Sequence, residues 1–148
     1  MSILITRPSP AGEQLTQRLI DAGKHAFHAP LIEIAAGKEL SILENKLNKL
    51  STGDYLFLLS KNAVWYANWQ LNQLQQSWPD TLFYYGIGQS TAEEFQQLTG
   101  HSIYYPELGE TSKDLLALSS LQQIENKRVL LLRGNGGREL LATTLRQR

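Results

Sequence analysis

The 148-residue chain is long enough for one ordinary domain, or for one domain and part of another. Hydrophobic residues make up 42% of it and charged residues 19%, which indicates a packed core and excludes a disordered chain. The 14 basic residues balance the 14 acidic ones, so we expect neither nucleic acid nor an anionic membrane as the main partner. The absence of cysteine excludes disulfides, zinc–thiolate sites and cysteine nucleophiles.

The first 35 residues predict three elements: a strand over residues 3–6, a helix ended by Gly23, and an extended stretch over residues 26–34. Pro30 lies in the last of these, which favours an edge or connecting strand. Three elements cannot bury a core by themselves. We therefore expect something that should pack on them to be missing from this chain.

From residue 40 onward, strands alternate with helices. Strands are predicted over residues 55–59, 82–87, 101–105 and 128–132, and helices over residues 40–50, 64–74, 91–98, 112–124 and 140–145. This alternation indicates right-handed crossovers and a parallel sheet. The predicted fold class is α/β: a flavodoxin-like domain with helices on both faces of its sheet.

The domain boundary is predicted near residues 35–39, where the periodic pattern is interrupted. Residues 1–35 would be an incomplete βαβ piece of a second, similar domain, and residues 36–148 most of an inserted domain. The last helical pattern is still running at Leu145, without a glycine or proline stop signal before Arg148. Together with the incomplete first unit, this predicts a truncated chain.

The N-terminus lacks the basic region and the apolar run of a secretory signal. No apolar segment approaches the roughly 18 residues needed to span a bilayer. We therefore expect a cytoplasmic protein without a membrane partner.

Ligands of open parallel sheets bind beyond the carboxyl ends of the strands. Four loops are predicted there, each followed by a helix whose free N–H groups suit carboxylates or phosphates. They supply the candidate binding residues Arg7, Ser60, Asn62, Gly88, Thr91, Arg133, Gly134 and Arg138. Helix capping alone would also account for Ser60, Asn62 and Thr91.

Other sites are weakly supported or excluded. The loop over residues 133–138 matches neither a Walker sequence nor a dinucleotide fingerprint. The three histidines show no metal-ligand spacing and are expected to be surface or structural residues, so no metal site is predicted. Trp65 and Trp69 lie on a predicted helix, where packing is the more common role and a partner surface the alternative.

The series of loops resembles the uroporphyrinogen-III synthase family. No single piece is specific, but their order and spacing cover essentially the whole chain. The pieces are Ile5-Thr6-Arg7-Pro8, Pro30-Leu31-Ile32-Glu33, Leu59-Ser60-Lys61-Asn62, Gly86-Ile87-Gly88-Gln89-Ser90-Thr91, Tyr105-Pro106 and Leu132-Arg133-Gly134-Asn135-Gly136-Gly137-Arg138.

The resemblance implies two α/β domains joined by crossing strands, the second inserted into the first. It implies a cyclising hydro-lyase of tetrapyrrole (heme) biosynthesis that needs no cofactor. Its substrate, hydroxymethylbilane, carries eight carboxylates, loses its hydroxyl as water and closes after inversion of ring D through a spiro intermediate. Helix N-termini and arginines in a cleft would hold these carboxylates.

By position, Thr91 corresponds to a substrate-cleft threonine of the family, and Arg7 and Ser60 match cleft loops. The tyrosine credited with assisting loss of water lies beyond Arg148, so no catalytic residue is assigned within this chain. The isolated chain is expected to be inactive. A full-length enzyme is expected to be monomeric, and the truncated chain to dimerise by pairing or exchanging strands. The alternative is a non-catalytic flavodoxin-like module for a small anionic ligand.

Overall fold

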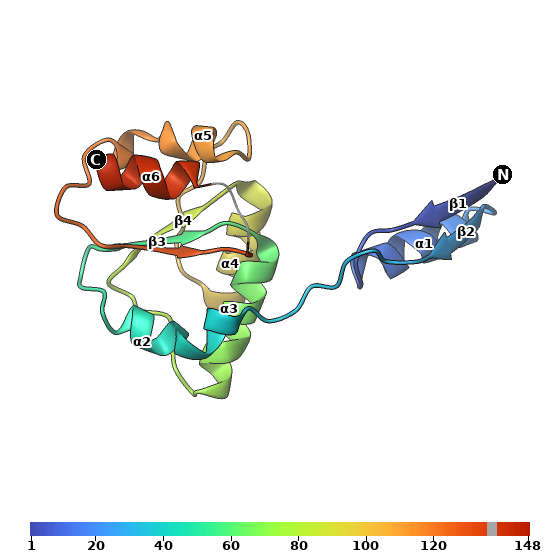
Figure 1. Ribbon diagram of the computed structural model, residues 1–148, viewed down its shortest axis with the longest axis horizontal. Helices are drawn as coiled ribbons and strands as arrows, with labels where there is room; N and C mark the ends of the chain where they lie inside the picture. Colours follow the sequence, from blue (N-terminus) through green and yellow to red (C-terminus); the bar gives the residue numbers. More distant parts are fainter. Residues whose placement is uncertain (136–138) are drawn as a thin grey trace. The chain divides into compact units, whose positions relative to one another are not determined.

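The structure is a computed structural model that describes residues 1–135 and 139–148. The chain divides into two compact units, Met1–Ala36 and Gly37–Arg148. Figure 1 shows the elements of each unit. Each unit forms its own set of internal contacts.

Unit 1 is a small βαβ arrangement with a two-stranded parallel sheet. Its elements are β1 (Ser2–Ile5), α1 (Ala11–Asp21) and β2 (His25–His28). The helix covers one face of the sheet. Leu4 and Phe27 are register partners on the other face and are 61% and 60% exposed. This apolar face therefore has no covering layer within unit 1.

The second strand of unit 1 is shorter than predicted. The extended stretch over residues 26–34 was expected to continue past Pro30, but β2 ends at His28. Proline cannot donate to a ladder, and the backbone of Ala29 and Leu31 is instead held by single bonds to β1 and its following residue. Ile32 lies outside the strand and is exposed.

Unit 2 contains a three-stranded sheet in the order β4-β3-β5. The strands are β3 (Tyr55–Leu58), β4 (Phe83–Gly86) and β5 (Val129–Leu132), and both pairs are parallel. The prediction of an α/β fold with a parallel sheet is confirmed. β3 is the central strand and all four of its residues are buried, as its unbroken apolar run predicts.

Helices cover both faces of this sheet (Figure 1). The elements are η1 (Lys38–Ile42), α2 (Leu43–Leu47), α3 (Lys61–Gln73) and α4 (Gln89–Thr99) on one face, and α5 (Ser112–Leu116), η2 (Ser119–Leu121) and α6 (Leu140–Gln147) on the other. The predicted helices on both faces are therefore present, and the fold has three layers.

Alternating side chains of β3 divide the core into two clusters. Leu56 and Leu58 belong to the cluster with α2, α3 and α4, which also contains Phe95. Tyr55 and Phe57 belong to the cluster with α5 and α6. Alternation with period two is what a strand buried on both faces requires.

One predicted helix of unit 2 is wrong in extent. The helix expected over residues 112–124 ends at Leu116, and Ile124 is buried beyond the separate turn η2. The side chain of Gln122 donates to the carbonyls of Leu116 and Leu118, and Arg148 also donates to the Leu116 carbonyl. Side-chain donors thus satisfy carbonyls that a longer helix would have paired.

The strand expected over residues 101–105 is reduced to one parallel bridge between Tyr104 and Tyr85. The N–H of Gly86 donates to the Tyr104 carbonyl at 2.8 Å, and the N–H of Tyr104 donates to the Tyr84 carbonyl at 2.9 Å. Pro106 cannot donate to a ladder and therefore opposes its extension. Within the described residues, no helix is both long and apolar enough to cross a membrane.

Candidate functional site

The carboxyl ends of the three parallel strands of unit 2 lie at one edge of the sheet. Leu58 is in register with Gly86 on one side and with Leu132 on the other. The loops after these strands therefore begin side by side, and two of them lead directly into α3 and α4 (Figure 1). The structure brings together the loops of Ser60, Gly88 and Arg133, as the parallel sheet predicts.

Ser60 is the N-cap of α3. Its Oγ accepts a hydrogen bond from the N–H of Ala63 at 3.1 Å, so a structural role is established for this side chain. Asn62 is exposed in the first turn of the helix. Of these two candidate binding residues, Ser60 has a capping role and Asn62 does not.

Gly88 precedes α4 as its N-cap, and Thr91 lies in the first turn. Both are buried: Thr91 is only 3% exposed. The neighbouring Gln89 and Ser90 are exposed. The predicted substrate-cleft threonine thus lies at the expected edge, but its side chain is covered in this structure.

Arg133 and Glu139 form an ion pair across the loop that precedes α6. The hydrogen bond from Arg133, reinforced by the charge of the same side chain, lowers the pKa of Glu139. Gly134 is exposed, with open space where a side chain would begin. The remaining predicted residue of this loop, Arg138, lies outside the described residues.

An ion pair that the sequence reasoning missed joins the two helices at this edge. Lys61 Nζ in the first turn of α3 lies 3.1 Å from Glu94 Oε2 in α4. The two residues are 33 positions apart, and only the packing of α3 against α4 brings them together. The sequence around Lys61 and Glu94 does not predict this contact, because each residue is typical of an ordinary exposed position in a helix.

Arg7 follows β1 in unit 1, and its side chain is exposed. Its carbonyl accepts a hydrogen bond from the His28 ring at 2.8 Å, in the tautomer that carries the proton on Nε2. Gly12 packs beneath this contact: an added Cβ would come within 2.2 Å of the Arg7 carbonyl oxygen. The loop that carries Arg7 is therefore fixed by contacts within unit 1.

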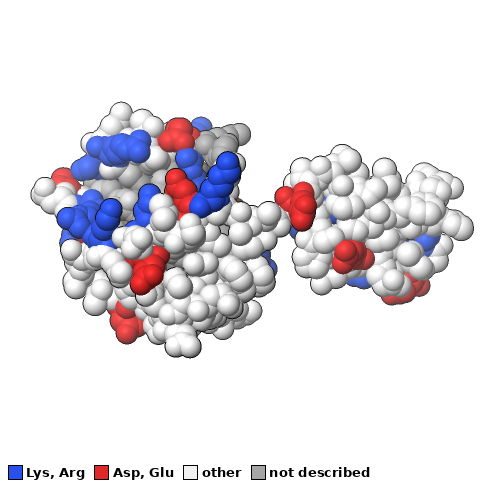
Figure 2. All heavy atoms as spheres, turned by 60° about the horizontal axis from the view of Figure 1, so that its bottom comes forward, with Lys and Arg blue, Asp and Glu red and all other residues white. Residues whose placement is uncertain are grey.

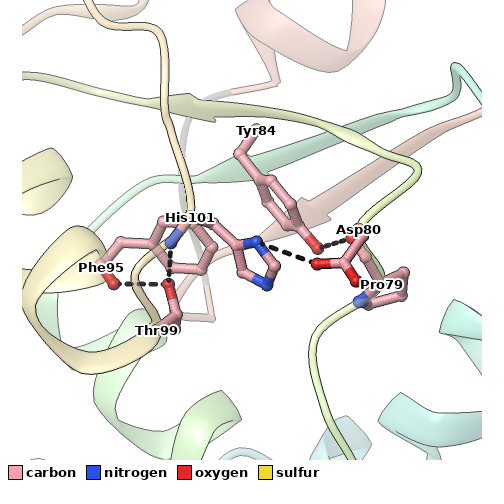
Figure 3. Close-up of polar contacts among 6 residues, drawn as sticks. All are labelled: Pro79, Asp80, Tyr84, Phe95, Thr99 and His101. Atoms are coloured by element: carbon pink, nitrogen blue, oxygen red, sulfur yellow. Dashed lines mark hydrogen bonds and ion pairs between the residues drawn. The ribbon is translucent and has the colours of Figure 1, made fainter.

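His101 lies among aromatic side chains (Figure 3). Its ring stacks on Tyr84 with 5.3 Å between centroids, and its Nδ1 lies 3.5 Å from Asp80 Oδ1. The backbone N–H of His101 donates to Thr99 Oγ1 at 3.2 Å. Among the described residues, no three His, Asp or Glu side chains gather in a way that could hold a metal ion. The structure gives His101 a packing role.

Basic and acidic side chains are mixed on the face of unit 2 that is visible in Figure 2. Trp65 and Trp69 of α3 are 50% and 43% exposed, so core packing accounts for only part of each ring. A partner surface at these two residues stays a prediction.

Comparisons with known proteins agree on one family. The sequence profile described as "Uroporphyrinogen-III synthase HemD" matches residues 13–148. Over its whole length, the chain is 97% identical to a uroporphyrinogen-III synthase of Proteus mirabilis. It is 49% identical to the uroporphyrinogen-III synthases of Escherichia coli (strain K12) and Salmonella typhimurium.

The matched relatives are longer than this chain. It covers 74% of the Proteus mirabilis protein and 60% of each of the other two. The match to the profile extends over the loops of Ser60, Gly88 and Arg133.

Proposed function

The chain belongs to the uroporphyrinogen-III synthase family, and on that premise we propose that it takes part in the cyclisation of hydroxymethylbilane to uroporphyrinogen III. In this reaction the terminal hydroxyl leaves as water, ring D is inverted through a spiro intermediate, and the macrocycle closes. The observation that carries the proposal is the family match across the loops at the carboxyl edge of the parallel sheet.

The proposed role of these loops is to hold substrate carboxylates. The helices α3 and α4 begin at this edge, and their first N–H groups together with the helix dipoles favour negative charge. Arg133 supplies a guanidinium beside them and can exchange the carboxylate of Glu139 for one of the substrate. Asn62 adds an exposed amide, and Gly134 allows close approach of a ligand to the backbone.

The chemistry proposed for the protein is mainly positioning. The pyrrole nitrogens of the substrate stabilise the cationic azafulvene that forms when hydroxide leaves, so the protein needs to hold the two ends together and assist that departure. We assign no catalytic residue within this chain. Ser60 contributes by fixing the start of α3, and Thr91 by its position in the first turn of α4.

The proposal includes the organisation of the chain. Residues 1–35 would form part of one α/β domain, and residues 36–148 most of a second one inserted into it. Arg7 would contribute to the cleft from the first domain. A cytoplasmic location, and the absence of nucleic acid as a partner, rest on the balance of 14 basic and 14 acidic residues and on the sequence pattern.

We also propose that the whole enzyme is monomeric and that the 148-residue chain dimerises by pairing or exchanging strands. The exposed face that carries Leu4 and Phe27 supports pairing of two copies, since burial of such side chains is favourable. Sedimentation at two protein concentrations separates the two states. A sedimentation coefficient independent of concentration, at the value of a monomer, would contradict the dimer.

The binding role is tested with uroporphyrin III, the stable oxidised form of the product, which carries the same eight carboxylates. Titration is followed by quenching of tryptophan fluorescence. We expect Arg133→Ala to weaken binding by about fivefold, because a charge-assisted contact to a carboxylate is lost. Arg128→Ala is the matched control: Arg128 immediately precedes β5, whereas Arg133 immediately follows it.

Equal losses of uroporphyrin III affinity in Arg133→Ala and Arg128→Ala would show that only the overall charge of the protein matters. That result would contradict a binding site at this edge of the sheet. The reaction itself is tested with hydroxymethylbilane, on which we expect the isolated 148-residue chain to show no turnover. Closure with and without inversion of ring D gives different isomers, so isomer analysis of the product separates the proposed reaction from unassisted closure. Tight binding of a flavin nucleotide in place of uroporphyrin III would favour the flavodoxin-like module instead.

A further inference from the structure

The side chain of Glu110 lies directly on Gly88, the N-cap of α4. A Cβ added to Gly88 would come within 2.4 Å of Glu110 Cγ and within 2.8 Å of Glu110 Oε1. The φ of Gly88 is −171°, an extended value open to any residue, so backbone strain does not account for glycine here. The close approach of the Glu110 side chain places a carboxylate of the chain itself at the start of α4.

Glu110 belongs to a segment that is attached at both ends. At one end, Tyr104 is bonded through its backbone to the end of β4, with 2.8 Å between Gly86 N and Tyr104 O. At the other end, Thr111 and Asp114 form a capping box that begins α5. Residues 105–110 connect these anchors, and the last of them, Glu110, reaches Gly88, two residues after β4. We call residues 105–110 the strap.

The middle of the strap has little to hold it in place. Leu108 is 87% exposed, and Glu107, Gly109 and Glu110 are also exposed. Gly109 has a φ of +91°, which permits a sharp change of chain direction just before Glu110. Pro106, by contrast, is buried. Such a segment can move its exposed part while its two ends stay attached.

Gly88, on which the Glu110 side chain lies, is buried, and so is Thr91 three residues later. The neighbouring Gln89 and Ser90 are exposed. A substrate carboxylate directed to the first turn of α4 would meet the carboxylate of Glu110 at the same place. Two carboxylates repel each other, so both cannot occupy the positive end of one helix dipole at low cost.

We propose that the strap is an internal competitor: the Glu110 carboxylate occupies the start of α4 in the absence of ligand and must be displaced before an anionic tetrapyrrole reaches Gly88 and Thr91. This inference rests on the proposed function and adds a residue that determines affinity. Glu110 affects the affinity by controlling whether an anionic ligand can reach the first turn of α4. Displacement removes the side chain that lies on Gly88, three residues before Thr91.

The experiment compares the affinity of the whole 148-residue chain and its variants for uroporphyrin III. Glu110→Gln keeps the size of the side chain but removes its charge, and we expect it to bind about two- to fivefold more tightly than the wild type. Glu107→Gln is the matched control, because it removes the same charge from the same exposed strap three residues earlier. We expect it to leave the affinity nearly unchanged.

Two further measurements separate displacement from a structural effect. The gain of Glu110→Gln is expected to shrink as salt rises from about 0.02 to 0.5 M, because a repulsion between exposed charges is screened. In the wild type, the backbone NMR signals of Gly109 and Glu110 are expected to shift when uroporphyrin III binds. Glu110→Ala is expected to show the same gain in affinity as Glu110→Gln.

The outcomes distinguish the strap from the proposed function. Binding of uroporphyrin III by the wild type with no gain in either Glu110 variant would overturn the strap alone. An equal gain in Glu107→Gln would also overturn it, since charge anywhere on the segment would then be sufficient. Failure of the wild type and all variants to bind uroporphyrin III would overturn the proposed function, and the strap together with it.

Discussion

The carboxylate of Asp54 accepts a hydrogen bond from the backbone N–H of Arg128, 74 residues later in the chain, at 3.1 Å. Its second oxygen accepts from the N–H of Ser51 at 2.7 Å. Asp54 is buried and immediately precedes the central strand β3, while Arg128 immediately precedes β5. One side chain therefore joins the starts of two adjacent strands to the turn before them.

We expect Asp54→Asn to destabilise the protein by about 1–3 kcal/mol at pH 7, because a buried charge-assisted acceptor is lost. Burial opposes ionisation of Asp54 and is the largest single effect on it. The hydrogen bonds from Ser51 and Arg128 and the nearby positive charges together outweigh burial and lower the pKa below 3.8. Urea denaturation measures the loss, and Glu125→Gln, at an exposed position, serves as the control.

The pH dependence of this effect follows from the lowered pKa. The stabilisation is complete above 3.8, the ordinary value, and is lost as the pH falls through the lower value of the folded state. The difference between the wild type and Asp54→Asn should therefore be constant from pH 7 to 5 and shrink below pH 4. A difference that grows on acidification would contradict this account.

Gly12→Ala should disrupt unit 1 and leave unit 2 folded. The added methyl would lie 2.2 Å from the Arg7 carbonyl oxygen and 2.3 Å from His28 Nε2, so the loop and β2 must separate. Such overpacking costs about 1–3 kcal/mol, which is large for a unit of this size. NMR spectra should lose the dispersed signals of residues 1–36 only. Gly37→Ala is the control, because open space surrounds that position.

Ser60→Ala tests how far the cap of α3 explains this residue. Loss of the bond to Ala63 should lower stability by about 1 kcal/mol, measured by thermal or urea unfolding. Ser60→Thr retains a capping hydroxyl and should recover most of that loss. If uroporphyrin III binding falls equally in both variants, the serine has a role in binding that capping does not explain.

Tyr84→Phe should show opposite effects at neutral and alkaline pH. The Tyr84 hydroxyl donates to the Pro79 carbonyl at 2.7 Å, and its loss should cost about 0.5–1.5 kcal/mol at pH 7. Burial, with a contribution from the charge of Asp80, raises the pKa of Tyr84 above the ordinary 10.0. The protonated hydroxyl contributes its whole stabilisation below pH 10. This stabilisation is lost as the pH rises above 10.

Between pH 10 and 11.5, the wild type should therefore lose stability faster than Tyr84→Phe. Urea unfolding at pH 8 and 11 checks this, and Tyr104→Phe, which alters an exposed tyrosine, is the matched control. Parallel losses in the wild type and Tyr84→Phe would mean that Tyr84 is ionised as readily in the folded state as in the unfolded one.

The sequence predicts the sheet of unit 2 well because the signal is local. Tyr55 to Leu59 are five apolar residues in a row between polar turns, and such a run has few alternatives to a buried strand. The start of α3 is less sharply predicted: the periodic pattern begins at Val64, whereas the cap at Ser60 starts the helix at Lys61. Parallel strands then place the loops after β3, β4 and β5 at one edge without further information.

The missed features depend on contacts between distant segments. The helix expected to reach Ile124 ends early because Gln122 and Arg148 supply donors to its last carbonyls. Glu110 reaches Gly88 only because the backbone of Tyr104 is bonded to the end of β4. No local pattern around these residues contains that information, and helical periodicity alone favoured a longer helix. The binding roles of the predicted site residues stay predictions.

The alternation of β3 makes the length of this strand as important as its composition. Odd-numbered residues such as Tyr55 and Phe57 contact one layer of helices, and even-numbered ones such as Leu56 and Leu58 contact the other. One residue inserted before Leu56 would send every following side chain of the strand to the opposite layer. Both layers would then receive side chains of the wrong shape at once, which no single substitution in either layer can do.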